Sequence, residues 1–242
     1  MSVSHKFLSI FSPEGKLHQI ENTLNAVKNY GLTTVGVKGK DCVVVCTQKK
    51  VPDKLIVKES VTNIFKITDT IGVMVTGSVT DAKSLITYFR MMASEFRFKY
   101  GYHIPVQVLA KKISERNQLA TQFVGLRSMR CVFTLVGIDE EKGPQLFKID
   151  PSGMCLGYKA ISAGTKEQDA INYLEKQYKK KKEGWNNDEA VQTAIMCLQN
   201  VISTDFKSNE LEIGIATTDD IFFRTLSEEE IEAHLNTIAD MN

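Results

Sequence analysis

The sequence predicts an α+β fold in which two β-sheets lie face to face between two layers of helices, a four-layer α-β-β-α sandwich. The first observation is the order of the predicted elements: strands, two helices, strands, two helices, strands and one helix. The second is an amphipathic helix ahead of the first strand. The third is that no linker, low-complexity stretch or repeat divides the 242 residues.

The opening helix follows a turn at residues 12–15, where proline presets φ at the second position and glycine suits the last. Apolar residues then recur every three or four positions, which is typical of one helical stripe. The stripe consists of Leu17, Ile20, Leu24 and Val27. Gly31 is suited to the left-handed conformation that ends many helices.

The first half of the body is expected to contain two strand pairs and two helices. β-Branched runs between turn residues predict strands at 33–37, 42–47, 64–67 and 71–76. Asp81 is expected to cap a helix that Gly101 ends near residue 100. We interpret its apolar stripe as core rather than a cofactor site: Leu85, Phe89, Met92 and Phe96.

Pro105 is expected to open a second helix that ends near Gly125 and carries Leu109, Ile113 and Leu119. Strands are then predicted at 131–138, 146–149 and 156–163. The third helix begins after residues 164–166, with Ile171, Leu174 and Tyr178 facing inward.

A fourth helix is predicted over residues 187–204, with an inward stripe of Val191, Ile195, Leu198 and Ile202. Strands follow at 211–217 and 221–225. Ser227 and Glu230 form a predicted capping box for a last helix, whose inward residues are Ile231, Leu235 and Ile238.

Composition favours a globular protein without a nucleic-acid or membrane partner. The chain is 43% hydrophobic and 24% charged, its net charge is +1, and no apolar run approaches the roughly 20 residues that span a bilayer. Five scattered cysteines fit a reducing compartment. We interpret Cys42 and Cys46 as buried thiols rather than half of a zinc site. The four histidines are dispersed, and no motif predicts a cofactor or a metal.

Several short motifs resemble the proteasome alpha-type subunits, in order and at that family's spacing. Residues 11–17, FSPEGKL, differ from the family pattern only by lysine in place of arginine, and QIE follows at residues 19–21. Further matches are GKDC at 39–42, TQKKVPDKL at 47–55, KYGY at 99–102, GID at 137–139, DPSG at 150–153 and GYKA at 157–160. Among the eukaryotic members, the segments at 47–55, 98–102 and 229–235 most resemble the first ring position, also called iota or alpha type six.

This resemblance implies a sandwich of the N-terminal-nucleophile hydrolase type, with a single domain over residues 1–242. Residues 1–30 would form the gate segment and helix, and residues 31–242 the body. The implied role is a non-catalytic structural and gating subunit of the 20S core, in the outer ring of seven alpha subunits, within ubiquitin-dependent protein degradation. The implied partners are neighbouring alpha subunits, beta subunits beneath, and the C-terminal tails of a regulatory particle or activator. The implied location is cytoplasm and nucleus.

The resemblance also assigns residues to surfaces. Family positions of the activator pocket fall at Leu17, Glu21, Gly77 and Asn63, where Asn63 replaces a lysine that could bind a tail carboxylate. The gate positions are Ser4, His5, Lys6, Pro13 and Asn22, and of these only Pro13 keeps the family residue. The ring contact would use Leu17, Ile20 and Leu24, although the stripe could instead pack on the chain's own body. Residues 127–130, RSMR, replace the family's Arg-Pro-aromatic/Leu-Gly and leave this turn unpredicted. So many departures suggest a divergent lineage.

The sequence is also compatible with two other functions. In active beta-type relatives, an autoprocessed threonine becomes the first residue and its own amine assists the hydroxyl. Thr33 or Thr34 could be such a nucleophile, but Leu32 stands where glycine should precede it, and the lysine of active relatives falls at Asn63 in an ungapped alignment. A free-standing binding module is the third alternative. A lysine run at residues 179–182 is interpreted as a solvated helix end rather than a nuclear import signal.

Overall fold

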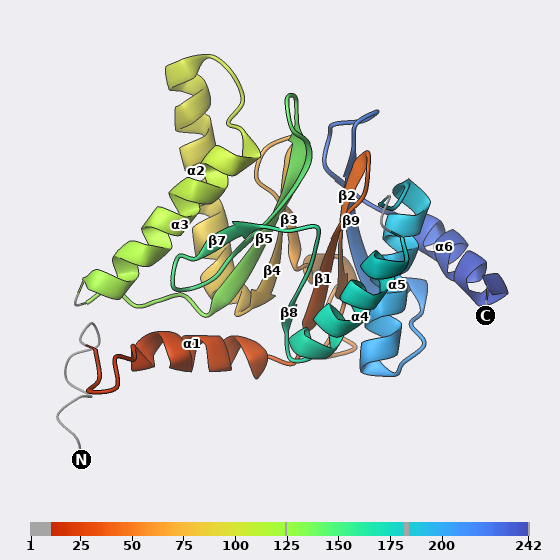
Figure 1. Cartoon of the computed structure of the whole chain (residues 1–242), viewed down its shortest axis with the longest axis horizontal. Coiled ribbons are helices and arrows are strands. Elements are labelled where there is room, and N and C mark those ends of the chain that lie inside the picture. Colours follow the sequence, from red (N-terminus) through yellow and green to blue (C-terminus); the bar gives the residue numbers. More distant parts are fainter. Residues whose placement is uncertain (1–10, 124, 182–183, 242) are drawn as a thin grey trace.

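The computed structural model describes residues 11–123, 125–181 and 184–241, and it forms the four-layer sandwich that the sequence predicts (Figure 1). The first sheet has the strand order β10-β9-β2-β1-β8, and all its neighbours are antiparallel. Its strands are β1 (Thr33–Lys38), β2 (Cys42–Gln48), β8 (Ala160–Gly164), β9 (Leu211–Thr217) and β10 (Arg224–Thr225).

The second sheet has the order β3-β4-β5-β6-β7 and is also antiparallel throughout. Its strands are β3 (Ile64–Lys66), β4 (Ile71–Gly77), β5 (Cys131–Asp139), β6 (Gly143–Ile149) and β7 (Cys155–Gly157). The two sheets meet over an apolar layer to which both contribute: Val43, Val45, Ile64, Met74, Val136, Leu146, Ile161, Ala216 and Phe223. Phe223 fits there because Gly72 and Gly214 leave space for its ring.

Each sheet buries its outer face under one pair of helices, as the element order requires. Helices α2 (Val79–Tyr100) and α3 (Val106–Gln122) cover the second sheet, and α4 (Glu167–Lys180) and α5 (Asn187–Ile202) cover the first. Helix α6 (Glu228–Met241) packs beside α5, and α1 (His18–Lys28) crosses one end of the sandwich (Figure 1). Two short 3₁₀ turns, Lys58–Ser60 and Ser208–Glu210, complete the assigned elements.

The predicted core stripe of α2 is confirmed. Leu85 and Phe89 are buried against the second sheet, and Met92 and Phe96 pack partly buried beside them. Phe89 meets Phe133 of β5 edge to face, with 5.1 Å between the ring centroids, which is a favourable aromatic geometry. Gly101 ends α2 in the left-handed conformation, as predicted.

The helix cap was predicted correctly for α6 and incorrectly for α2. The capping box of α6 is confirmed, because Ser227 Oγ accepts from the Glu230 amide at 3.2 Å and the Glu230 carboxylate accepts from the Ser227 amide at 2.8 Å. The prediction that Asp81 caps α2 is wrong. Ser78 is the cap, and its hydroxyl accepts the amide hydrogen of Asp81 at 3.4 Å.

Three further predictions are corrected. Residues 156–163 form two strands in different sheets, β7 and β8, because the chain crosses between sheets at Tyr158 and Lys159. The strand predicted at 221–225 is reduced to β10. Leu119 is 44% exposed, because α3 turns this position away from the sheet.

Cys42 and Cys46 are buried with free thiols, as predicted, and burial raises the pKa of Cys42 to about 11. Within residues 11–123, 125–181 and 184–241, no three or more histidine, cysteine, aspartate or glutamate side chains gather as a metal site. None of the helices in those ranges combines the length and apolar character needed to cross a membrane.

Candidate functional site

Helix α1 is an integral part of the fold and forms one wall of the candidate site. Ile20, Thr23 and Val27 are buried, and Val27 packs against Val132 of β5 and Ala163 of β8. The apolar stripe is therefore divided between two surroundings. Ile20 and Val27 bury their side chains on this chain's own body, whereas Leu17 and Leu24 are only partly covered.

The link from α1 to β1 is held by hydrogen bonds on both sides. Thr165 Oγ1 donates to the carbonyl oxygen of Lys28 at 2.6 Å, and the Thr165 amide donates to Leu32 O at 3.0 Å. Lys50 Nζ donates to Gly31 O at 2.7 Å, and Gly31 has a φ of +82°. These bonds satisfy carbonyl groups at the end of the helix and in the link that follows it, and they fix the direction of α1 relative to the sheets.

The predicted turn ahead of α1 is confirmed. The Gly15 amide donates to Ser12 O at 2.8 Å, the Ser12 amide donates to Lys16 O at 2.9 Å, and Gly15 has a φ of +75°. Pro13 lies exposed at the turn, and Asn22 is exposed on α1. The other predicted gate residues, Ser4, His5 and Lys6, lie outside the described residues.

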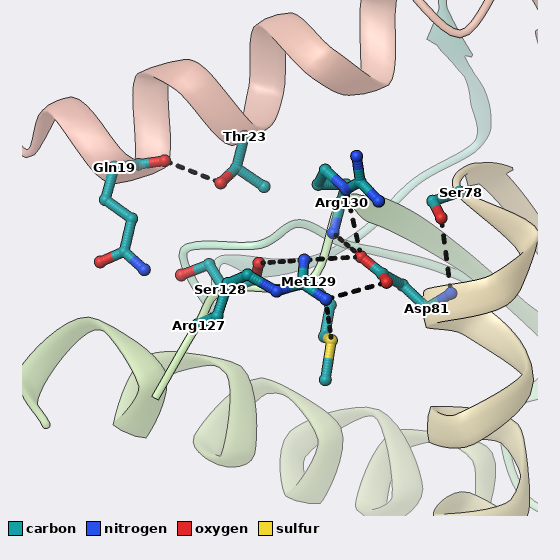
Figure 2. Close-up of polar contacts among 8 residues, drawn as sticks. All are labelled: Gln19, Thr23, Ser78, Asp81, Arg127, Ser128, Met129 and Arg130. Carbon is teal, nitrogen blue, oxygen red and sulfur yellow. Dashed lines mark hydrogen bonds and ion pairs between the residues drawn. The ribbon is translucent and has the colours of Figure 1, made fainter. Parts of the chain in front are cut away.

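An ion-pair cluster beneath α1 holds the segment that the sequence left unpredicted (Figure 2). The Asp81 carboxylate accepts two hydrogen bonds from the Arg127 guanidinium, both at 2.9 Å, in a bidentate pair. It also accepts the Arg130 amide at 3.0 Å and lies 3.4 Å from Arg130 Nε. These hydrogen bonds, led by those from Arg127, hold the pKa of Asp81 well below its usual range. Figure 2 shows Gln19 and Thr23 of α1 across from this segment.

The ion-pair cluster lies where β4 ends and β5 begins, next to α1. The Ser78 amide donates to Arg130 O at 2.8 Å, which joins the end of β4 to the residue before β5. Gly77 adopts a φ of +118°, and a Cβ on it would overlap the carbonyl oxygen of Arg130. Only glycine fits there without strain, because both its backbone conformation and its contact with Arg130 exclude a side chain.

The other predicted pocket positions lie at the same end of the sandwich. Leu17 is the residue before α1, and Glu21 lies exposed on the helix with His18 Nδ1 3.5 Å and Lys16 Nζ 3.9 Å from its carboxylate. Asn63 precedes β3, the edge strand of its sheet, and is buried. Its amide donates to the Glu212 carboxylate at 2.9 Å, and its carbonyl accepts from the Val75 amide at 2.8 Å. Leu17 and Glu21 thus belong to one wall, and Asn63 to the edge of a sheet.

The threonines considered as nucleophiles are buried strand residues in peptide linkage. Thr33 Oγ1 accepts the Lys166 amide at 3.2 Å, and Thr34 Oγ1 shares a hydrogen bond with Thr76 Oγ1 at 2.6 Å. The Thr34 carbonyl accepts from Ser162 Oγ at 2.9 Å. In the described parts of the chain, no lysine amino group makes a hydrogen bond to either hydroxyl.

Comparison with known proteins finds one protein family over most of the chain. Residues 28–216 match the Proteasome family, described as proteasome subunit. The chain is 48% identical to "Probable proteasome subunit alpha type-1" of Schizosaccharomyces pombe, over 96% of this chain and 95% of that protein. It is 39% identical to "Proteasome subunit alpha type-6" of Caenorhabditis elegans, over 97% and 95%. It is 36% identical to "Proteasome subunit alpha" of Methanosarcina mazei, over 96% and 92%.

Proposed function

This chain belongs to the proteasome subunit family as an alpha-type member, and we propose that it is a non-catalytic structural subunit of the alpha ring. Near full-length identity to alpha-type relatives supports the ring assignment. A non-catalytic role is supported by α1, which buries Ile20 and Val27 on this chain's own body and is joined to β1 by a hydrogen-bonded connection, so that release of the Thr33 nitrogen would remove an integral part of the fold. That connection is the observation that carries the proposal.

A direct test changes the two threonines in the assembled particle. Thr33→Ala and Thr34→Ala, made separately, are expected to leave peptide hydrolysis per assembled particle within about twofold of wild type, because neither hydroxyl has a free amine to activate it. Activity is normalised to the amount of particle on a native gel, since Thr34→Ala also removes the bond to Thr76. Loss of one class of peptide cleavage in an otherwise intact particle would assign the nucleophile to this chain.

The partly covered face of α1 is proposed as the contact with a neighbouring alpha subunit. Leu17 and Leu24 retain exposed apolar area beside the buried Ile20, so a neighbour could extend the buried stripe without disturbing the fold. This divides the predicted ring contact: Leu17 and Leu24 face outward, and Ile20 supports them from this chain's side.

Leu24→Asp tests that contact. It is expected to reduce incorporation into the ring at least about fivefold in competition with wild type, because it places a charge in an apolar interface. Asn25→Asp is the matched control, since Asn25 is the next residue of α1, is exposed, and gains the same charge. Equal incorporation of both variants would place the ring contact elsewhere. The unfolding curve of each purified chain separates loss of contact from loss of fold.

Gating and activator docking are proposed for the same end of the molecule. The segment that ends at Pro13 leads into α1, and Leu17, Glu21 and Gly77 lie around that helix. We propose that Asn63, at the sheet edge, faces an adjacent subunit and binds the carboxylate of an activator tail more weakly than a lysine would. The proposed partners are beta subunits beneath and activator tails above, and the proposed location is cytoplasm and nucleus.

In the lysine run at residues 179–182, Lys181 forms an ion pair with Glu189, which favours a structural role for that lysine.

A further inference from the structure

A second surface with binding character lies away from α1. A groove of about 300 Å³ runs between the turn that joins β3 to β4 and the C-terminal half of α2. The buried residues in its lining are apolar: Ile67, Ala93 and Ile104. The exposed residues are mostly basic and include one carboxylate and one serine: Lys66, Arg90, Arg97, His103, Asp69 and Ser94.

The basic groups of the groove have no counterion within the described chain. Arg90 Nε donates to the Lys66 carbonyl oxygen at 2.9 Å, which fixes the guanidinium against the end of β3. Within the described ranges, the terminal nitrogens of Arg90 and the side chains of Lys66 and Arg97 make no hydrogen bond or ion pair. Three other arginines form ion pairs, Arg127 and Arg130 with Asp81 and Arg224 with Glu230, whereas Arg116 lies over the ring of Tyr88.

This arrangement fits a carboxylate supplied from outside. Three cations around one hollow repel one another, and Asp69 offsets only part of their charge. A carboxylate in the groove would relieve this repulsion and could accept several charge-assisted hydrogen bonds at once. The anchored Arg90 guanidinium needs little reorganisation to meet it.

The surroundings favour a protein segment over a small anion. The last turn of α2 next to the groove exposes Phe98 and Tyr100, the segment that follows exposes Tyr102, and Phe98 is 95% exposed. Exposed aromatic residues beside arginines are typical of protein interfaces. The apolar lining of the groove also suits an apolar side chain next to the carboxylate, which an inorganic anion does not supply.

The position of the groove indicates which neighbour reaches it. Strand β4 begins at Ile71, beside the groove, and ends at Gly77, beneath α1. The groove therefore lies at the end of the sandwich opposite α1, as Figure 1 shows for the end of α2. We propose that it binds an acidic segment of the subunit stacked on that end, an aspartate or glutamate next to an apolar residue. This inference rests on the proposed place in the ring.

Photo-crosslinking in the assembled particle tests the proposal. Ser94 lies exposed in the groove, so Ser94→p-benzoylphenylalanine is expected to cross-link to a peptide of another subunit that contains aspartate or glutamate. The same replacement at Lys112, exposed on α3 and outside the groove, is the control. A cross-link from Ser94 to nucleic acid, to a peptide without acidic residues, or to nothing in an assembled particle would overturn the proposal.

Charge reversal provides the second readout. Arg97→Glu is expected to lower incorporation about tenfold in competition with wild type, and Lys112→Glu to leave it unchanged. Unfolding of the isolated chain should change only slightly in Arg97→Glu, by the effect of a negative charge in the last turn of α2, because the Arg97 side chain makes no hydrogen bond or ion pair within the described residues. Equal incorporation of Arg97→Glu and Lys112→Glu would contradict the proposal that the groove binds another subunit. Failure of the wild-type chain to enter a particle contradicts the proposed function instead, so the two failures are distinguishable.

Discussion

Replacement of Gly77 by alanine is expected to lower the free energy of unfolding by about 3 kcal/mol. Two effects add: the φ of +118° is strained for any residue with a Cβ, and that Cβ would overlap the Arg130 carbonyl oxygen and lie 3.1 Å from Cys131 Cα. Because backbone atoms are in the way, no side-chain rotation relieves the overlap. For a chain of this size the melting temperature should fall by roughly 6–12 °C.

Gly101→Ala is the matched control for that prediction. Gly101 has a φ of +80°, but an added Cβ would meet nothing within 4 Å. Alanine there should cost about 1 kcal/mol, from the backbone conformation alone. Denaturant unfolding of both variants gives the difference. Equal losses would mean that the backbone around Gly77 and Arg130 relaxes, and that β4 is not packed tightly against the segment beneath α1.

Asp81→Asn is expected to lower the free energy of unfolding by about 2 kcal/mol at pH 7. Asp81 is 8% exposed, and the change removes the charge that holds Arg127 and Arg130. The exposure of the two arginine side chains, more than half of each, keeps the loss below that of a fully buried pair. Glu115→Gln, in an exposed pair at 4.0 Å with Lys111, should change stability by less than about 0.5 kcal/mol.

The pH dependence of the Asp81 contribution follows from its lowered pKa. A carboxyl whose pKa is lower in the folded than in the unfolded state stabilises the fold above the unfolded pKa, about 3.9 for aspartate. That contribution is lost as the pH falls from about 4 toward the folded pKa. The difference in stability between wild type and Asp81→Asn should therefore be constant near neutral pH and shrink in acid. A difference that grows in acid would contradict the ion-pair account.

Much of the fold could be predicted because local patterns and global packing agree. The stripe of α2 was recognisable from Leu85 and Phe89, and the end of that helix from Gly101. The split of residues 156–163 into β7 and β8 was not recognisable, because Tyr158 and Lys159 interrupt no apolar alternation. Which sheet a residue joins depends on distant partners, here Leu146 for Tyr158 and Lys38 for Lys159.

The candidate site was predictable only in part. The turn at Ser12–Gly15 and the stripe of α1 followed from turn chemistry and helical spacing. The role of Asp81 did not, because an aspartate near a helix start usually suggests a cap, and its arginine partners lie 46 and 49 residues away in sequence. Ser78, three residues earlier, was the signal for the true cap. Within the described residues, the absence of an ion pair for Lys66, Arg90 and Arg97 depends on tertiary structure, and no local sequence pattern indicates it.

The proposed function requires that this chain keeps α1 and acts as a non-catalytic member of the alpha ring. The most direct test is the intact mass of the chain, together with the native size of the assembly that contains it, after purification from its own cells. The account predicts a chain that retains α1, within a very large particle whose peptide hydrolysis belongs to other chains. A chain that begins at Thr33 or Thr34 would contradict it, because Leu32 and all of α1 would then be a removed segment.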